Sequence, residues 1–172
     1  MAGSDTTAVA IRAIFLHLIT NPRILTKFRT EYENASISSP ITDSEARKLS
    51  YLQAIIKEGL RIWPPVVGLM AKEVPSEGDV INGLFVPGGT SIGYCAWGIF
   101  RSKKIFGSDA DVFRPERWLD DPPAQIKEVE HTLELIFARE KYECLGKNVA
   151  LMELNKVFVE VSRCLPFCFY VK

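Results

Sequence analysis

The sequence has no hydrophobic run long enough to span a bilayer, because its longest apolar stretch, Ala8 to Ile19, is interrupted by Arg12 and His17. The residues before that stretch carry Asp5 and neither Lys nor Arg, which is not the pattern of a secretory signal peptide. The chain also lacks an excess of charge, with 21 basic and 21 acidic residues. No basic patch carries interleaved aromatic residues, so we expect no nucleic-acid partner.

Cysteine and histidine are both scarce. The four cysteines form no C-x-x-C pair and no zinc-binding spacing, and four thiols in 172 residues do not make a disulfide scaffold. We therefore expect reduced thiols at Cys95, Cys144, Cys164 and Cys168. The two histidines, His17 and His131, lie outside any catalytic signature, which argues against a cysteine hydrolase.

Apolar residues make up 47% of the 172 positions, which is enough for one domain with its own core. Helical spacing of apolar residues predicts four main helices, at 1–20, 21–32, 51–61 and 147–165. The first is apolar nearly all round, so we expect it to be buried on all sides. Asn21 is the expected N-cap of the second, and Thr42 to Glu45 form a capping box before a short helix.

The middle of the chain is richer in β-formers and turns. Short strands are predicted at 66–74, 79–81, 84–86 and 90–95, with Asn82 and Gly83 as a type I′ hairpin turn. We expect residues 97–111 to be irregular and residues 120–129 to form a charged loop. The predicted fold is therefore mainly α with a small antiparallel β-sheet.

The last predicted helix follows the stretch from Phe137 to Gly146, and its buried stripe is expected to consist of Leu151, Leu154, Phe158, Val161 and Leu165. Cys144 lies where that stretch enters the helix. The positive end of the helix dipole favours a thiolate there, and a thiolate can be a nucleophile or a metal ligand. The alternative is a buried, inert cysteine, which is the commoner fate of an isolated free thiol.

The stretch resembles the haem-ligand loop of the cytochrome P-450 monooxygenases, whose pattern is F-x-x-G-x-R-x-C-x-G. Phe137, Cys144 and Gly146 match this pattern. Two positions depart from it: Glu140 replaces a Gly, and Tyr142 replaces the usual Arg. The residues from Lys141 to Lys147 are similar to fungal members of the family.

Other motifs of the same family follow in the family's order. Residues 2–7 resemble its A-G-x-D-T-T signature for oxygen activation, in which Gly3 leaves room beside a flat ligand and Asp5 and Thr6 orient and protonate dioxygen. Read alone, this segment is a helix start with polar caps.

The family's structural clamp, E-x-x-R with a later arginine, is also matched. Glu58 and Arg61 precede Pro64-Pro65, and Arg117 lies in a segment similar to F-x-P-E-R-F/W, from Phe113 to Trp118. Read alone, the pair Glu58–Arg61 is a surface ion pair worth about 0.2–0.5 kcal/mol, because the two residues are three positions apart on a helix.

The resemblance implies a haem b cofactor, with Cys144 as the axial iron ligand. Phe137, Gly146 and Gly3 are then expected to contact the haem. Lys72 is expected to pair with a haem propionate, more weakly than the family's arginine because an ammonium cannot make two parallel hydrogen bonds. The family often has His-Arg where this chain has Phe100-Arg101, so a second propionate contact is not expected from a histidine.

The resemblance spans essentially the whole chain and corresponds to the C-terminal portion of the cytochrome P-450 fold. We therefore expect residues 1–172 to form a single partial domain, without the N-terminal two thirds that carry the membrane anchor and most of the substrate pocket. The final strand pair of the family is also expected to be missing from residues 165–172.

The implied function is a haem-dependent monooxygenase that hydroxylates a small, lipophilic organic substrate. Electrons would come from NADPH through a flavoprotein reductase, and a full-length form would lie on the cytosolic face of the endoplasmic reticulum membrane. The alternative is a non-catalytic remnant of such an enzyme that at most binds haem.

Overall fold

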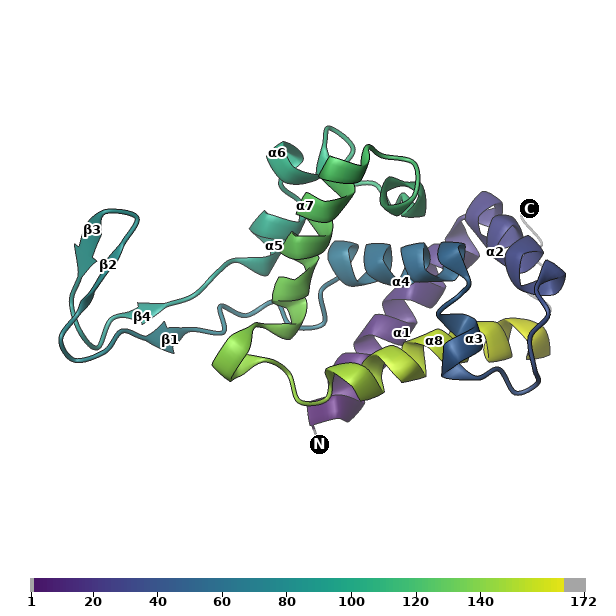
Figure 1. Cartoon of the computed structure of the whole chain (residues 1–172), viewed down its shortest axis with the longest axis horizontal. Coiled ribbons are helices and arrows are strands. Elements are labelled where there is room, and N and C mark those ends of the chain that lie inside the picture. Colours follow the sequence, from purple (N-terminus) through teal and green to yellow (C-terminus); the bar gives the residue numbers. More distant parts are fainter. Residues whose placement is uncertain (1, 166–172) are drawn as a thin grey trace.

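The computed structural model describes residues 2–165, which are mainly helical with two short antiparallel sheets (Figure 1). The helices are α1 (Ala2–Thr20), α2 (Pro22–Asn34), α3 (Asp43–Ala46), α4 (Ser50–Ile62), α5 (Ala96–Phe100), α6 (Lys103–Phe106), α7 (Pro123–Leu133) and α8 (Lys147–Cys164). The strands are β1 (Lys72–Glu73), β2 (Asp79–Ile81), β3 (Leu84–Val86) and β4 (Ser91–Ile92). Three single 3₁₀ turns are η1 (Pro115–Trp118), η2 (Glu134–Phe137) and η3 (Glu140–Tyr142). The predicted fold class is thereby confirmed.

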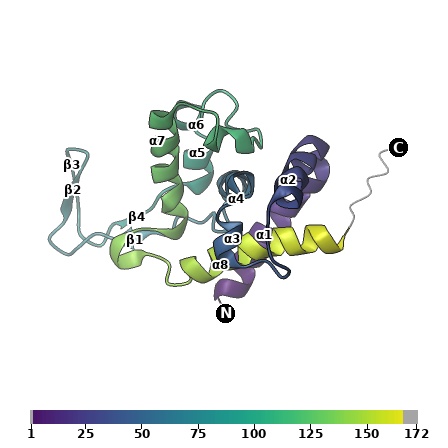
Figure 2. The same ribbon diagram turned by 45° about the vertical axis from the view of Figure 1, so that its right-hand side comes forward.

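Helix α4 lies at the centre of the helical body, where α1 and α8 pack against it and against each other (Figures 1 and 2). Within residues 2–165, α1 is buried along one face; its expected burial on all sides, in the middle of something larger, stays a prediction. Its buried apolar side chains, Ala10, Ile14 and Leu18, form one stripe at four-residue spacing. Leu16, on the opposite side, is 56% exposed, because within residues 2–165 the neighbours of α1 cover only one of its faces.

Two of the predicted helix starts differ in detail. The capping box is confirmed: the backbone N–H of Glu45 donates to the Thr42 hydroxyl, and the Glu45 carboxylate accepts from the Thr42 N–H at 2.9 Å. Asn21 precedes α2 as expected, but its side chain does not cap that helix. The Asn21 amide instead donates to the carbonyl of His17 at 2.7 Å, so it satisfies the end of α1 rather than the start of α2.

The buried face of α8 is narrower than the predicted stripe. Leu154, Phe158 and Val159 are buried, whereas Leu165 is 52% exposed, and Leu151 and Val161 are only half-buried. Asn155 takes part in this face because its amide donates to Asp43 at 2.7 Å and accepts from Gln53 at 3.0 Å. A polar residue whose hydrogen bonds are all satisfied can occupy a core position that hydrophobic periodicity does not predict.

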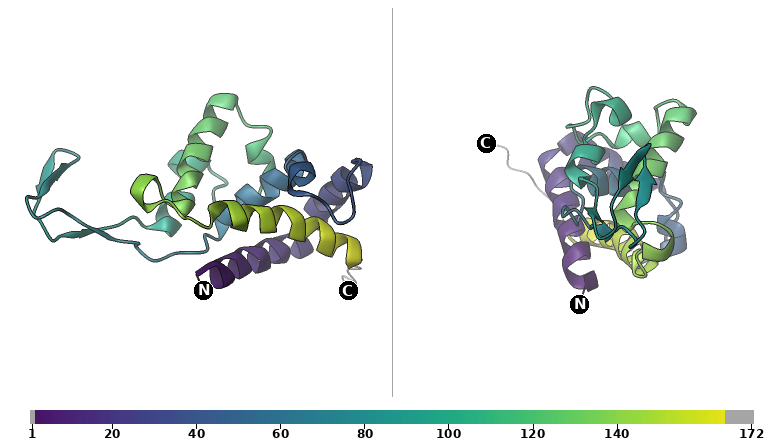
Figure 3. Two further views of the ribbon diagram at one scale, coloured as in Figure 1. Left: turned by 60° about the horizontal axis from the view of Figure 1, so that its bottom comes forward. Right: turned by 90° about the vertical axis from the view of Figure 1, so that its left-hand side faces the viewer.

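The strands form an arm that extends away from the helical body (Figures 1 and 2, and Figure 3, left). The prediction of one sheet was wrong in detail: β1 pairs with β4 and β2 pairs with β3, as two separate two-stranded sheets. β1 and β4 are also much shorter than predicted. Asn82 and Gly83 have φ values of 52° and 81°, as a type I′ turn requires, so that prediction is confirmed.

Two segments that were predicted to lack regular structure are partly helical. Residues 97–111 contain most of α5 and all of α6, and residues 120–129 contain the start of α7. Pro123 occupies the first turn of α7, where a missing N–H costs nothing and the fixed φ favours the helix. The prolines that suggested a loop therefore begin a helix.

Three of the cysteines, Cys95, Cys144 and Cys164, are free and exposed, as expected of reduced thiols. Cys168 and the expected end of the fold at residues 166–172 lie outside the described residues. Within residues 2–165, no helix by itself has the length and hydropathy to cross a membrane, although α1 and α2 pass together as a pair bent by 105°.

Gly59 allows α1 and α4 to approach closely, because a Cβ atom at that position would lie 2.1 Å from Cγ1 of the fully buried Ile14. Replacing Gly59 by Ala is expected to destabilise the chain by about 1–3 kcal/mol, the usual cost of an overpacked core. Urea unfolding followed by circular dichroism measures this. Gly3→Ala is the matched control, since a Cβ there meets no atom within 4 Å. Equal stability of the two variants would contradict the close approach.

Candidate functional site

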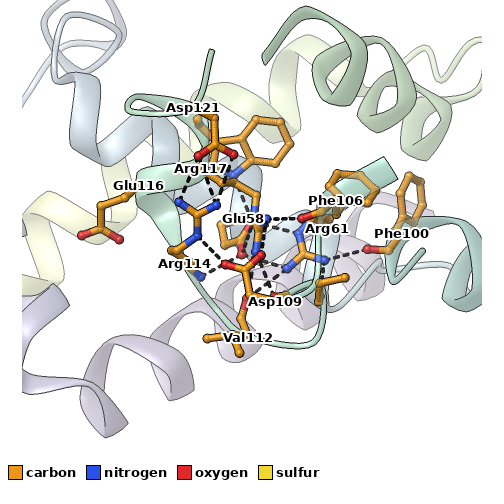
Figure 4. Close-up of polar contacts among 12 residues, drawn as sticks. Glu58, Arg61, Phe100, Phe106, Asp109, Val112, Arg114, Glu116, Arg117 and Asp121 are labelled. Carbon is orange, nitrogen blue, oxygen red and sulfur yellow. Dashed lines mark hydrogen bonds and ion pairs between the residues drawn. The ribbon is translucent and has the colours of Figure 1, made fainter. Parts of the chain in front are cut away.

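A buried carboxylate, Glu58 on α4, gathers two arginines around it (Figure 4). Arg61 donates from Nε to Glu58 Oε2 at 2.9 Å and from a terminal nitrogen to Oε1 at 2.8 Å. Arg117, from η1, donates to Oε1 at 3.1 Å. Glu58 and Arg61 have no exposed surface and Arg117 is 1% exposed, so the structure brings together the three residues of the expected clamp.

The remaining arginine N–H groups donate to backbone carbonyls of the segment that leads from α5 to η1. Arg61 donates to the carbonyls of Phe100 at 2.6 Å and Ala110 at 2.7 Å, and Arg117 donates to Phe106 at 2.7 Å. Buried charges are tolerated only when they are paired and their remaining donors are satisfied. The clamp meets this condition, and by doing so it fastens residues 100–118 onto α4.

Two further donors to Glu58 were not identified from the sequence. The indole N–H of Trp118 donates to Oε2 at 3.0 Å, and the backbone N–H of Arg114 donates to Oε1 at 2.8 Å. The Arg114 side chain forms an outer layer of ion pairs with Asp109 and with Asp121, the latter at 3.1 Å. The sequence motif from Phe113 to Trp118 gives the residue types at these positions. Only the structure shows which of them contact the Glu58 carboxylate.

Glu116, in the same motif, is a second carboxylate that sequence reasoning missed. It accepts from Arg23 of α2 at 2.8 Å and from the hydroxyl of Tyr51 at 2.9 Å, and Lys27 lies 3.4 Å away. Partial burial acts to raise the pKa of Glu116, but the hydrogen bonds from Arg23 and Tyr51 outweigh it and lower the pKa to about 2. Glu116 therefore joins η1 to α2 while Glu58 joins it to α4.

His17 lies on the other side of the clamp, where its ring stacks on Phe113 with the ring centres 4.4 Å apart. Burial lowers the pKa of His17, and although the nearby Glu58 charge opposes this shift, Arg101 and Arg61 add to it. The neutral imidazole therefore serves here as a flat packing surface.

The loop before α8 carries Cys144 and has an unusual backbone. Ala138 and Glu140 have φ values of 54° and 53°, in the left-handed region that favours glycine. The N–H of Cys144 donates to the carbonyl of Phe137 at 2.8 Å, and the carbonyl of Cys144 accepts from the N–H of Lys147 at 3.2 Å. Glu140 thus occupies, at positive φ, the position where the family pattern has Gly.

Cys144 is exposed and lies two residues before Gly146, the N-cap residue of α8. This placement does not fit the alternative of a buried, inert thiol. Gly146 lies near the sulfur, since a Cβ there would lie 3.9 Å from Sγ, which is an ordinary van der Waals distance. Phe137 is half-buried and packs against the main core, so it anchors the start of the loop. Lys72 reaches this loop from β1, with Nζ 3.9 Å from the centre of the Tyr142 ring.

Residues 2–7 form the first turns of α1, which lie at the same end of the molecule as the loop before α8 (Figures 1 and 3). Gly3 and Asp5 are exposed, Thr6 is half-buried, and a Cβ on Gly3 would meet no atom within 4 Å. Open space therefore adjoins this glycine, and its expected place beside a flat ligand stays a prediction.

Arg101, in the position of the family's His-Arg pair, is bound within the protein. It donates to the carbonyl of Ile62 at 2.8 Å, lies 3.5 Å from Asp111, and stacks over Trp97 at 4.5 Å. No group of three or more His, Cys, Asp or Glu residues within residues 2–165 could hold a metal ion directly.

A model of the cytochrome P-450 family matches residues 1–163, and the chain therefore belongs to the cytochrome P-450 family. Members of this family generally carry a haem with a thiolate ligand. The chain is 45% identical to cytochrome P-450 monooxygenase ABA1 of Pyricularia oryzae over 97% of this chain and 34% of that protein. The corresponding monooxygenase of Botryotinia fuckeliana is 43% identical (95% and 33%), and pisatin demethylase of Fusarium vanettenii is 40% identical (94% and 31%).

These relatives are fungal, which confirms the fungal resemblance. The chain spans about a third of the length of the curated relatives it matches. The matched third corresponds to the predicted partial fold, with the clamp and the cysteine loop both inside it.

Replacing Glu58 by Gln removes the charge that Arg61 and Arg117 share while keeping the shape of the side chain. We expect a loss of about 3–5 kcal/mol, since two buried guanidinium groups would lose their carboxylate. Urea unfolding of the purified variant measures this, and a drop in soluble yield would accompany it. Arg47→Gln breaks an exposed pair with Asp43 and should change stability by at most about 1 kcal/mol. A Glu58→Gln variant as stable as this control would contradict the role of the clamp.

Replacing Glu140 by Gly is expected to stabilise the chain. A non-glycine residue in the left-handed region destabilises the fold by about 1–2 kcal/mol, and glycine removes this cost. Glycine itself destabilises the fold by about 0.5–1 kcal/mol, because its unfolded chain has more conformational entropy to lose. The net gain is therefore about 0.5–1 kcal/mol, measured by urea unfolding. Glu140→Ala removes the carboxylate but keeps the backbone cost, so it should not reproduce the gain. If it does, charge rather than backbone conformation is responsible.

Proposed function

We propose that this chain provides the haem-binding part of a fungal haem-thiolate monooxygenase, which hydroxylates a small lipophilic substrate. The observation that carries the proposal is the exposed Cys144 sulfur beside the amino end of α8, in a chain that belongs to the cytochrome P-450 family. The residues present fit the group: a single thiolate donor, a glycine next to it, and an aromatic anchor at Phe137.

When bound, haem b would supply the activation of dioxygen, and a cysteinate ligand favours cleavage of the O–O bond. The residues of the chain would hold and orient it. Cys144 would hold the haem iron through its sulfur, Gly146 would lie near that sulfur, and Lys72 would offer an ammonium to a propionate. On the opposite side, Gly3 would leave space, the Thr6 hydroxyl would orient dioxygen, and the Asp5 carboxyl would deliver a proton.

The clamp supports this site without touching the reacting atoms. Glu58, Arg61 and Arg117 fix η1 and the segment before it onto α4, and α4 in turn packs on both α1 and α8. The two elements that carry Asp5 and Thr6 on one side and Cys144 on the other are thus held against one central helix. Rigid elements of this kind preserve the geometry that a bound cofactor needs.

The relatives' names support the type of reaction that we propose. Several are called monooxygenases and one a demethylase, which fits oxidation of an organic substrate by molecular oxygen. We propose that electrons come from NADPH through a flavoprotein reductase, and that a full-length form acts at the cytosolic face of the endoplasmic reticulum membrane. The membrane contact would be made by an amino-terminal anchor rather than by residues 2–165.

A second candidate function is a haem-binding module without catalytic activity, a remnant of such an enzyme. It is favoured by the strained Glu140 at a position where the family pattern has Gly. The two candidates differ in turnover but share the ligand, so haem binding is tested first.

Cys144→Ser tests the ligand. The purified chain is loaded with haem, reduced and exposed to carbon monoxide, and a strongly red-shifted Soret band is expected for cysteinate ligation. The band should be lost in Cys144→Ser and kept in Cys164→Ser, which removes an equally exposed thiol at the far end of α8. Absence of the band from the unmodified chain would contradict the proposed ligand. Consumption of NADPH with an added reductase then separates the monooxygenase from the module.

A further inference from the structure

A contact between an ammonium and an aromatic ring joins the arm to the cysteine loop. Lys72 lies on β1, paired with Ile92 of β4, and its Nζ lies 3.9 Å from the centre of the Tyr142 ring. Both side chains are exposed at the surface, and Tyr142 is 51% exposed. A cation at this distance over a ring face is attracted by the negative charge density of the ring.

The loop that this contact reaches needs external support. Ala138 and Glu140 both have positive φ, and such conformations persist only where the surroundings determine them. The ion pairs of the loop are local in sequence: Arg139 pairs with Glu134 at 3.0 Å, and Glu143 pairs with Lys147 at 2.8 Å. Phe137 packs against the main core, but it does so only at the start of the loop. Lys72 differs because it approaches from a strand that lies seventy positions earlier in the chain.

Tyr142 suits a position beside the Lys72 ammonium better than the arginine of the family pattern does. The family pattern has Arg at position 142, and an Arg there would place a second cation beside the Lys72 ammonium. Tyr142 instead offers a neutral ring, which turns a repulsion into an attraction. Lys141 also lies over this ring, with Nζ 5.5 Å from its centre, but it belongs to the same turn as Tyr142 and so cannot join the loop to β1.

We propose that Lys72 and Tyr142 are positioning residues that brace the cysteine loop against β1 before any haem is bound. The brace holds the loop that carries Cys144. This inference rests on the proposed function only for the statement that the Cys144 sulfur binds haem. Its direct effect is on the haem-free chain. It lowers the population of open loop conformations, so the sulfur is already placed when a ligand arrives.

The first experiment measures hydrogen exchange of residues 137–146 in the haem-free chain. Tyr142→Leu and Lys72→Met should each raise the open population of the loop about two- to fivefold, the range expected for an exposed contact between a cation and a ring. Tyr142→Phe keeps the ring, and Lys72→Arg keeps the cation, so both should exchange like the unmodified chain. Lys141→Met is the matched control and should also leave exchange unchanged.

Tyr142→Arg gives a sharper test, because it restores the family residue but opposes Lys72. It should loosen the loop, and combining it with Lys72→Met should reverse part of that loosening. Equal exchange in Tyr142→Leu and the unmodified chain would overturn the brace. Exchange in α4 serves as an internal reference, and it should stay constant because none of these exposed positions belongs to the core.

The second experiment titrates haem into the same variants and follows the Soret band. If the brace preorganises the ligand, Tyr142→Leu should bind haem about two- to fivefold more weakly, whereas Tyr142→Phe should bind normally. Lys72→Met is left out of this titration, because Lys72 is also the residue proposed to pair with a haem propionate. A chain whose loop exchange responds to these substitutions but which shows no cysteinate band would refute the proposed function and leave the brace intact. Unchanged exchange together with a normal cysteinate band would refute only the brace.

Discussion

The buried negative charge of Glu58 is the constraint on which the rest of the structure depends. A carboxylate with no access to water must find donors within the protein, and here it accepts from two guanidinium groups, an indole and a backbone N–H. Each arginine in turn carries more donors than one carboxylate can accept. Their surplus N–H groups bind carbonyls between Phe100 and Val112, a segment with only short helices of its own. One charge thus determines the path of a region that its own local sequence defines poorly.

The clamp and the cysteine loop stabilise the chain in different ways. The clamp is fully buried and satisfied, so its contribution is insensitive to salt and solvent. The loop is exposed, has two residues at positive φ, and depends on weak contacts at its surface. Local opening should therefore cost less free energy at residues 137–146 than at α4, because the loop buries less apolar surface and its contacts are exposed to water.

Helices with strong hydrophobic periodicity, such as α2 and α4, could be predicted from the sequence, and so could the capping box at Thr42. α5 and α6 could not, because four- and five-residue helices are too short for periodicity and are held largely by the arginines of the clamp. The start of α7 could not be predicted, because a proline such as Pro123 is as typical of a loop as of the first turn of a helix.

The same contrast applies to the candidate site. Motif spacing identified Glu58, Arg61, Arg117 and Cys144, since these residue types recur at fixed separations in the family. Glu116, Trp118 and the contact of Lys72 with Tyr142 were not identified, because they depend on which residues meet across the fold. The backbone at Glu140 lies between these cases: the mismatch with glycine was visible in the sequence, but its positive φ required the structure.

The arm exposes apolar side chains and strand edges to solvent. Its outer hairpin exposes Val80, Leu84 and Phe85 by 64–72% of their surfaces beside strand edges that lack a partner within residues 2–165. Unprotected edges with apolar side chains are templates for intermolecular β-pairing. Self-association of the isolated chain is therefore expected to begin at this hairpin while the helices remain folded, so crowding rather than heat would limit its handling in solution.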